Sequence, residues 1–377
     1  SVFGRIAKAD EGLAYKYPGF PEGELPQDNE IWYTTFDSKP LTEVAGQAGC
    51  SLVSNTYENG VGVLRYSSPL TSFDRISENL DDLERLTGIL VPDCVEYIGD
   101  RVIWDSEKVQ EFRVPANLKG TKAFTCRKPT ALERFYGHHV SEDERCIVID
   151  GVIYAFAPAG LTSYEVPSGV VRISSNSFSL TKELKSVVLP SGLTTLEQDC
   201  FAFSGLESVY IPASVQSIDL YAFNQCRKLK QLLGESRFIS KDRKYLSDPD
   251  GMFGNTLFFF AGKDDTSYVI PDEVFAIENY AFLGCENLRS LTFPKDIQYI
   301  GGSAFEDCFN LETLYGPNTT SDHKGLVTDG YLQFVVSGIS GDYKVPDEVT
   351  ALGDHIFSNK PNLISVTMGD PVTSGAV

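Results

Sequence analysis

The stretch PSGVVRISSNSFSLTKELKSVVLP at residues 167–190 recurs as PDEVFAIENYAFLGCENLRSLTFP at residues 271–294, and this repeat decides the fold. An aliphatic residue stands three positions after the proline in all eight units, which start at Pro92, Pro115, Pro167, Pro190, Pro212, Pro271, Pro294 and Pro346. Six units carry a phenylalanine at plus eleven: Phe178, Phe201, Phe223, Phe282, Phe305 and Phe357. Self-similarity at a period of 22 or 23 residues indicates a solenoid.

Each unit is too short to bury an apolar face alone, so neighbouring units must stack in register and share one core. The segments before the prolines, such as LKSVVL at 184–189 and LESVYI at 206–211, predict short strands that stack into a parallel sheet. Proline ends each strand, because it has no N–H to donate to a ladder. The A-F-x-x-C stretches around Phe223, Phe282 and Phe305 predict one helical turn per coil.

The eight cysteines divide into a periodic and an irregular set. Cys226, Cys285 and Cys308 stand at plus fourteen, and Cys200 takes a small slot that alanine fills elsewhere. A small, apolar, periodic position is typical of a packing ladder, so we predict free thiols there. One pairing stays open among the irregular set, which is Cys50, Cys94, Cys126 and Cys146.

Three insertions interrupt the array, near residues 137–166, 234–270 and 316–345. Each carries Asp-Gly before an apolar, aromatic run, which predicts a β-hairpin that widens one coil. Residues 1–29 are polar and rich in proline, and we interpret them as a tether or arm. Residues 30–69 alternate and predict an N-terminal β cap that covers the end of the core, and residues 70–377 form the solenoid.

The repeat resembles the BspA-type leucine-rich repeat proteins, whose arrays carry similar DGxLxxF insertions. The resemblance covers about residues 30–370 and depends on the proline, the aliphatic slots, Ala-Phe-x-x-Cys and the leucine-led strand. It implies a right-handed leucine-rich repeat solenoid, horseshoe-like and α/β, built mostly of short parallel strands with single helical turns. It also implies an exported bacterial protein, at the cell surface or extracellular, in a family associated with adhesion and often lipid-anchored. Such an anchor would have sat on an N-terminal segment since removed.

Charge and motifs narrow the classes of function. The net charge of −20 disfavours nucleic acid and anionic membrane surfaces as partners, and no apolar run is long enough for a membrane span. The four histidines, His138, His139, His323 and His355, form no metal-binding spacing, and no nucleophile elbow, phosphate loop or dinucleotide motif occurs. The sequence therefore predicts no enzyme, metal or cofactor.

The strand before each proline offers two outward-facing columns across the stacked coils. The first column runs through Arg134, Ser186, Ser208, Gln231, Ser290, Thr313 and Ser365. The second column runs through Tyr136, Val188, Tyr210, Leu233, Thr292, Tyr315 and Thr367. Tyrosine supplies a large contact area with a polar tip. We predict Arg134, Tyr136, Tyr210, Gln231 and Tyr315 as ligand-binding residues. Ordinary solvent-facing sheet positions would have the same composition.

We therefore expect a non-enzymatic cell-surface binding protein that mediates adhesion to host matrix proteins or glycans. The alternative is a structural or scaffolding module of the cell envelope, and the third possibility is a carbohydrate-active role. The ligand, the oligomeric state and the mode of anchoring are left open by the sequence.

Overall fold

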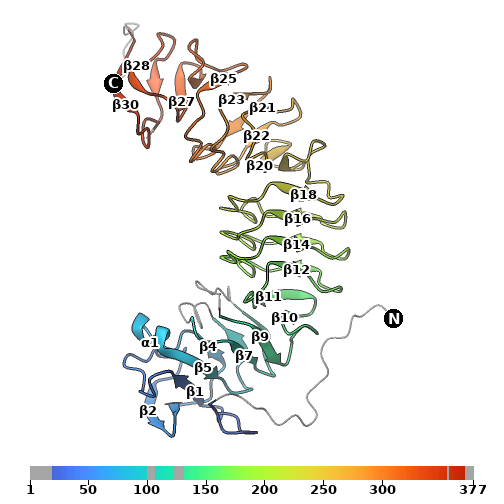
Figure 1. Cartoon of the computed structure of the whole chain (residues 1–377), viewed down its shortest axis with the longest axis vertical. Helices are drawn as coiled ribbons and strands as arrows, with labels where there is room; N and C mark the ends of the chain where they lie inside the picture. Colours follow the sequence, from blue (N-terminus) through green and yellow to red (C-terminus); the bar gives the residue numbers. More distant parts are fainter. Residues whose placement is uncertain (1–18, 100–106, 122–130, 355, 370–377) are drawn as a thin grey trace. The chain divides into compact units, whose positions relative to one another are not determined.

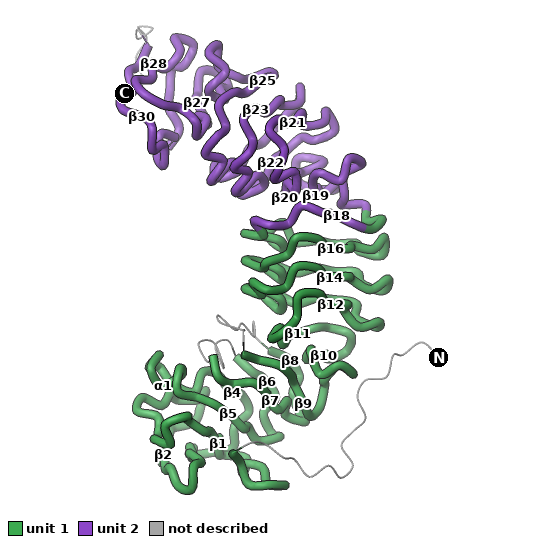
Figure 2. Tube along the Cα trace, in the orientation of Figure 1, with its two compact units in different colours: residues 1–226, 234–236 green, residues 227–233, 237–377 purple. Residues whose placement is uncertain are grey.

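The computed structural model describes residues 19–99, 107–121, 131–354 and 356–369 (Figure 1). The chain divides into two compact units, shown in Figure 2. Unit 1 comprises residues 1–226 and 234–236, and unit 2 comprises residues 227–233 and 237–377. Both units are β-solenoids of stacked, mostly parallel strands. The predicted solenoid fold is therefore confirmed.

Unit 1 begins with a four-stranded antiparallel sheet in the order β2-β3-β1-β5. Its strands are β1 (Glu30–Thr35), β2 (Leu52–Glu58), β3 (Val61–Tyr66) and β5 (Leu86–Leu90). A tight turn at Asn59 and Gly60, both with positive φ, joins β2 to β3. Helix α1 (Leu80–Arg85) is the one α-helix of the described residues and leads into β5. One edge strand of this sheet, β5, therefore comes from outside residues 30–69, the range predicted for the cap.

The solenoid part of unit 1 stacks two rows of short strands. The first row holds β4 (Ser72–Phe73), β6 (Tyr97–Ile98) and β8 (Gly120–Thr121), then β10 (Cys146–Ile149), β11 (Val152–Phe156), β13 (Arg172–Ile173), β15 (Thr195–Leu196) and β17 (Ser217–Ile218). The second row holds β7 (Glu111–Val114) and β9 (Arg134–Gly137), then β12 (Ser163–Glu165), β14 (Ser186–Val188) and β16 (Ser208–Tyr210). Apart from the β10–β11 hairpin, neighbouring strands pair in parallel.

Unit 2 repeats the arrangement. One row holds β19 (Tyr245–Asp248), β20 (Thr256–Phe260), β22 (Ala276–Ile277) and β24 (Tyr299–Ile300), then β26 (Gly325–Thr328), β27 (Tyr331–Val335) and β29 (Ala351–Leu352). The other holds β21 (Ser267–Val269), β23 (Ser290–Thr292), β25 (Thr313–Tyr315), β28 (Gly341–Lys344) and β30 (Leu363–Thr367). Strand β18 (Gln231–Leu233) also belongs to unit 2 but is not part of the sheet that contains β21. The antiparallel pairs β19–β20 and β26–β27 are hairpins of the second and third insertions, as β10–β11 is of the first.

The A-F-x-x-C stretches are successive tight turns in place of the helical turn that the sequence predicts. The N–H of Asn224 donates to the carbonyl of Tyr221, and that of Cys226 to the carbonyl of Phe223, each three residues back. Gln225 between them has a φ of 60°. A residue in the left-handed region interrupts a run of helical backbone angles, so no helix forms and the chain turns back toward the next strand.

Stacked phenylalanine rings form the centre of each core. In unit 1, ring centroids lie 5.1 Å apart for Phe178 and Phe201, and 5.4 Å apart for Phe201 and Phe223. The first insertion extends the ladder, because Phe156 of β11 lies 4.4 Å from Phe178. In unit 2, Phe260 of β20 lies 4.6 Å from Phe282 in the same way. In these two insertions the hairpin therefore supplies the ring that a tight turn supplies in an ordinary coil.

The periodic cysteines are free, buried thiols, as predicted. The thiols of Cys226 and Cys308 each lie 3.1 Å from a carbonyl of the preceding coil, at Phe201 and Phe282. The three irregular cysteines that the structure describes, Cys50, Cys94 and Cys146, are also free, whereas Cys126 lies outside the described residues.

The ring ladder predicts a contrast between two neighbouring phenylalanines. Phe201 is fully buried in the stack, whereas the side chain of Phe203 is 50% exposed. We expect Phe201→Ala to lower the free energy of unfolding by about 3–5 kcal/mol, since it removes a buried ring and leaves a cavity. The control Phe203→Ala should cost less than about 1 kcal/mol. Urea unfolding followed by circular dichroism measures both, and equal losses would contradict the ladder.

Candidate functional site

The outward columns exist as the sequence predicts. In β12, β14, β16, β23 and β25, a buried residue lies between two outward neighbours, as Val187 lies between Ser186 and Val188. Parallel register sets the outward residues side by side, so that Ser186 pairs with Ser208 and Val188 with Tyr210. In unit 2 the same register pairs β21, β23 and β25 and brings Val269, Thr292 and Tyr315 into one column.

The five predicted binding residues are divided among separate parts of the chain. Arg134, Tyr136 and Tyr210 belong to unit 1, and Gln231 and Tyr315 to unit 2. Within unit 1, β9 pairs with β7 whereas β16 pairs with β14, so Tyr136 and Tyr210 lie in different sheets.

Arg134 and Tyr136 are engaged inside the molecule. The guanidinium of Arg134 forms ion pairs with Glu111 at 2.7 Å and Glu144 at 3.2 Å. The half-buried ring of Tyr136 packs against a small cluster that includes Phe20 and Leu90. An outward position on a strand is therefore not free where another segment covers it. Arg134 is exposed but held by its two ion pairs, and Tyr210, Gln231 and Tyr315 are the other exposed members of the predicted set.

The exposed apolar part of the columns is small and flat in each unit. Val188 is 43% and Tyr210 38% exposed in unit 1, and Val269 is 66% and Tyr315 46% exposed in unit 2. Exposed ion pairs border them, Lys185 with Glu207 and Arg289 with Glu312. The arrangement is an aromatic and aliphatic strip with a polar margin, which suits contact with a partner surface.

A second repeated device, which the sequence reasoning missed, fixes the three insertions. Each begins with Ser or Thr, one residue, Asp, one residue, and Arg or Lys: SEDER at 141–145, SKDRK at 240–244 and TSDHK at 320–324. In each the hydroxyl donates to the Asp Oδ1, over 2.5, 2.7 and 2.6 Å, for Asp143, Asp242 and Asp322. The residue that follows each Asp has a positive φ: Glu144, Arg243 and His323. The sequence signal for this device is the five-residue pattern itself, which occurs shortly before each Asp-Gly.

The aspartate of this device contacts a tyrosine of the strand that follows the hairpin. The Tyr268 hydroxyl of β21 donates to the Asp242 Oδ2 over 2.8 Å. Burial raises the pKa of the Asp242 carboxyl, but hydrogen bonds from Ser240 and Tyr268 outweigh burial and hold that pKa below its usual value. The pair ties the start of the insertion to the sheet, so its role is to hold the hairpin in place.

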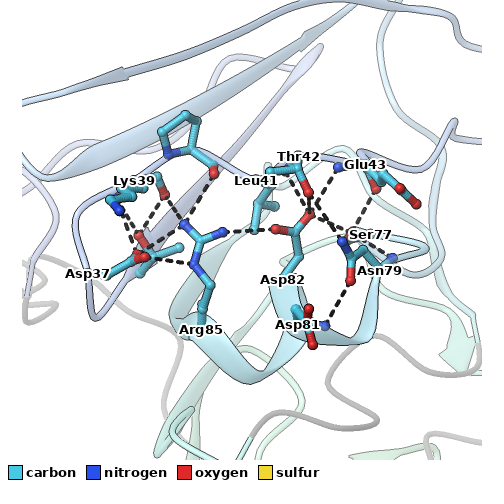
Figure 3. Close-up of polar contacts among 12 residues, drawn as sticks. Asp37, Lys39, Leu41, Thr42, Glu43, Ser77, Asn79, Asp81, Asp82 and Arg85 are labelled. Atoms are coloured by element: carbon cyan, nitrogen blue, oxygen red, sulfur yellow. Dashed lines mark hydrogen bonds and ion pairs between the residues drawn. The ribbon is translucent and has the colours of Figure 1, made fainter.

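A dense polar network in the cap is also structural (Figure 3). Asp82 of α1 is 1% exposed, and its Oδ2 accepts from the backbone N–H groups of Thr42 at 2.7 Å and Glu43 at 3.0 Å and from the Ser77 hydroxyl at 3.0 Å. Its Oδ1 accepts from Arg85 at 3.0 Å, and Arg85 also donates to Asp37. These bonds use both carboxylate oxygens to join the 37–43 loop to α1.

The described residues hold no group of three or more His, Cys, Asp or Glu side chains that could bind a metal ion. The rings of His138 and His139 are tilted by 54°, and His139 Nε2 lies 3.2 Å from the carbonyl oxygen of Ala116. No helix in the described ranges combines the length and apolar character needed to cross a membrane.

Comparison with known families agrees with this geometry. The sequence profile of the BspA type leucine-rich repeat region matches residues 153–242 and 256–375, in six copies. The chain belongs to the BspA-type leucine-rich repeat family. Repeat proteins of this BspA type serve generally in protein interaction or adhesion and are typically binding modules. A search of curated protein sequences found no match.

The chain is also similar to solved structures. A leucine-rich cell surface protein from Faecalibacterium prausnitzii is 18% identical, with a TM-score of 0.55 and 97% of each chain covered. The pneumococcal vaccine antigen PcpA is 19% identical, with a TM-score of 0.45 over 85% of this chain and 71% of that one. At these identities the likeness to the Faecalibacterium protein extends to the fold alone.

The cap network predicts a large effect from one carboxylate. Asp82→Ala should lower the free energy of unfolding by about 3 kcal/mol, because it leaves Arg85 and several buried donors without their acceptor. The neighbouring Asp81→Ala is the matched control, since Asp81 is exposed and should change stability by less than about 0.5 kcal/mol. Thermal unfolding of both variants measures the difference, and similar melting temperatures would argue against the network.

The Tyr268–Asp242 pair predicts an effect that depends on pH. Tyr268→Phe should cost about 1 kcal/mol at pH 7, by loss of an exposed charge-assisted hydrogen bond. A carboxyl with a depressed folded pKa stabilises fully above its unfolded pKa of about 3.9, and this contribution is lost as pH falls through the folded pKa. The cost should therefore shrink in acid. Tyr315→Phe is the control, and urea midpoints from pH 7 to pH 3 give the comparison.

Proposed function

We propose that the chain is a non-enzymatic binding protein displayed at the cell surface or outside the cell, where it adheres to a host matrix protein or glycan. The observation that carries the proposal is the exposed strip of valine and tyrosine on the second row of strands in each unit. Family membership supports it, because these repeats are generally binding modules. The description of the Faecalibacterium protein as a cell surface protein supports the location.

The chemistry of the strip favours a protein or glycan partner. Tyrosine rings are frequent anchors of protein interfaces and also stack on sugar faces, and the strip places them on rigid strands. The net charge of −20 repels nucleic acid and anionic lipid, which carry the same sign. The strip is flat, so we expect a broad and shallow contact in which a few exposed side chains supply most of the affinity.

The proposal is tested by surface plasmon resonance of the full chain on immobilised fibronectin, laminin and collagen, and on a glycan array. Two double variants remove the strip, Val188→Ser with Tyr210→Ala and Val269→Ser with Tyr315→Ala. We expect at least one of them to weaken binding about tenfold or more, as for loss of an interface anchor. The control, Tyr97→Ala with Tyr331→Ala, removes equally exposed tyrosines from the first row of strands and should bind unchanged. Equal binding by all variants, or none by the parent chain, would overturn the proposal.

A further inference from the structure

A pocket of about 420 Å³ opens in unit 2 beside the third insertion. Three segments line it: the turn at residues 302–309, the end of β27 with the residues that follow it, and residues 354 and 356–360 near the end of the described chain. None of its lining residues belongs to the valine and tyrosine strip. The volume lies within the range of natural small-molecule sites, which is about 300–1,000 Å³.

The register of the hairpins places one ring of the third insertion at the pocket. Leu257 pairs with Ile277, and Leu332 pairs with Leu352, so the second and third insertions align at Leu257 and Leu332. In this alignment the buried Val335 takes the place of Phe260, whose ring stacks on Phe282. The neighbouring Phe334 lines the pocket, and its ring centroid lies 4.9 Å from that of Phe305.

The second insertion carries a buried lysine whose charge has a partner within the protein. Lys263 is 5% exposed, and its Nζ donates to the carbonyl of Leu283 over 2.7 Å and lies 5.1 Å from the ring centroid of Phe259. The aligned residue of the third insertion is Gly338, where a Cβ atom would meet Leu311 and Glu312. The third insertion therefore has no lysine at this position.

The last turn, which follows the third insertion, places a lysine at the pocket. Lys360 Nζ lies 5.3 Å from the ring centroid of Phe334, and no described residue offers it a hydrogen bond or an ion pair. Burial lowers the pKa of this ammonium to about 8. The rings of Phe305 and Phe309 also line the space, so one part of a mostly polar lining combines three rings with a positive charge that has no acceptor among the described residues.

Carboxylates stand around the opening and restrict what can enter. Glu306 and Asp354 are exposed, and Asp307 pairs with Arg227 at 2.6 Å. Together with the net charge of −20 they repel nucleotides, phosphorylated ligands and acidic polymers, which would place several negative charges near them. A ligand with one negative charge on an apolar body satisfies both the interior and the opening.

We propose that this pocket binds a small amphipathic carboxylate, whose acid group pairs with Lys360 and whose apolar body lies against Phe305, Phe309 and Phe334. The charge-assisted hydrogen bond gives orientation, and the rings give apolar contact. The site is independent of the adhesive strip, so either can fail without the other.

The test measures binding of three probes that share one ring, namely phenylacetate, phenylacetamide and phenethylamine, to the full chain by calorimetry and ligand-observed NMR at pH 7. Phenylacetate should bind at least about tenfold more tightly than the amide or the amine, as expected for a hydrogen bond between charged partners. Lys360→Met should remove this preference. Lys182→Met, at an exposed lysine without an ion pair in unit 1, is the matched control and should leave binding unchanged.

A pH series on the unmodified chain supplies a readout that needs no variant. Phenylacetate stays ionised above pH 7, so its affinity should fall about tenfold or more between pH 7 and 9.5 as Lys360 loses its proton. The other charged groups that line the pocket are the carboxylates Glu306, Asp307 and Asp354, and the buried Cys308 thiol beside Cys285 has its pKa raised well above its usual value. No binding of phenylacetate, equal binding of the amide, a pH-independent affinity, or unchanged binding by Lys360→Met would each overturn the proposal.

Discussion

No coil of this protein can bury its own apolar residues, and the stacking of one ring on the next is the constraint that every other feature obeys. Phe178, Phe201 and Phe223 in unit 1 follow one another at van der Waals spacing, and Phe260 and Phe282 do so in unit 2. Each insertion adds a ring beside that of a neighbouring coil. Phe156 and Phe260 of the first two hairpins lie against Phe178 and Phe282, and the ring centroid of Phe334 in the third lies 4.9 Å from that of Phe305.

The ladder determines which surfaces are free to evolve a function. Inward positions are fixed by packing. The outward residues of the second row can differ between coils without loss of core packing, and some of them are valine and tyrosine. The hairpins are likewise free at their tips but fixed at their starts, because the Ser/Thr-Asp device holds them to the sheet. Variation is therefore concentrated on a rigid framework, the arrangement in which side chains can recognise a partner without a large entropic loss.

The predictable part of the structure is its local and periodic part. The proline period and the aliphatic slots specify strands and core because each slot is repeated in several coils, and Asp-Gly marks the hairpins because the turn needs positive φ. The Asp82 network joins residues about 40 positions apart, and β5 enters the cap sheet from a segment that reads as a repeat. Tyr136 is outward on its strand yet covered by the cluster around Phe20 and Leu90. Such contacts depend on which segment covers which, and no period in the sequence encodes that.

In an array of near-identical coils, function is found where one coil departs from the others. Lys263 and Lys360 show this, because both ammonium groups lie against a phenylalanine ring beside the ladder. For Lys263 the carbonyl of Leu283 repays the desolvation of the charge, so the group is complete within the protein. Lys360 is partly buried without an acceptor among the described residues, and a packed core gains nothing from such a group. The charge is retained where an acceptor from outside can reach it, and the pocket beside Phe334 provides that access.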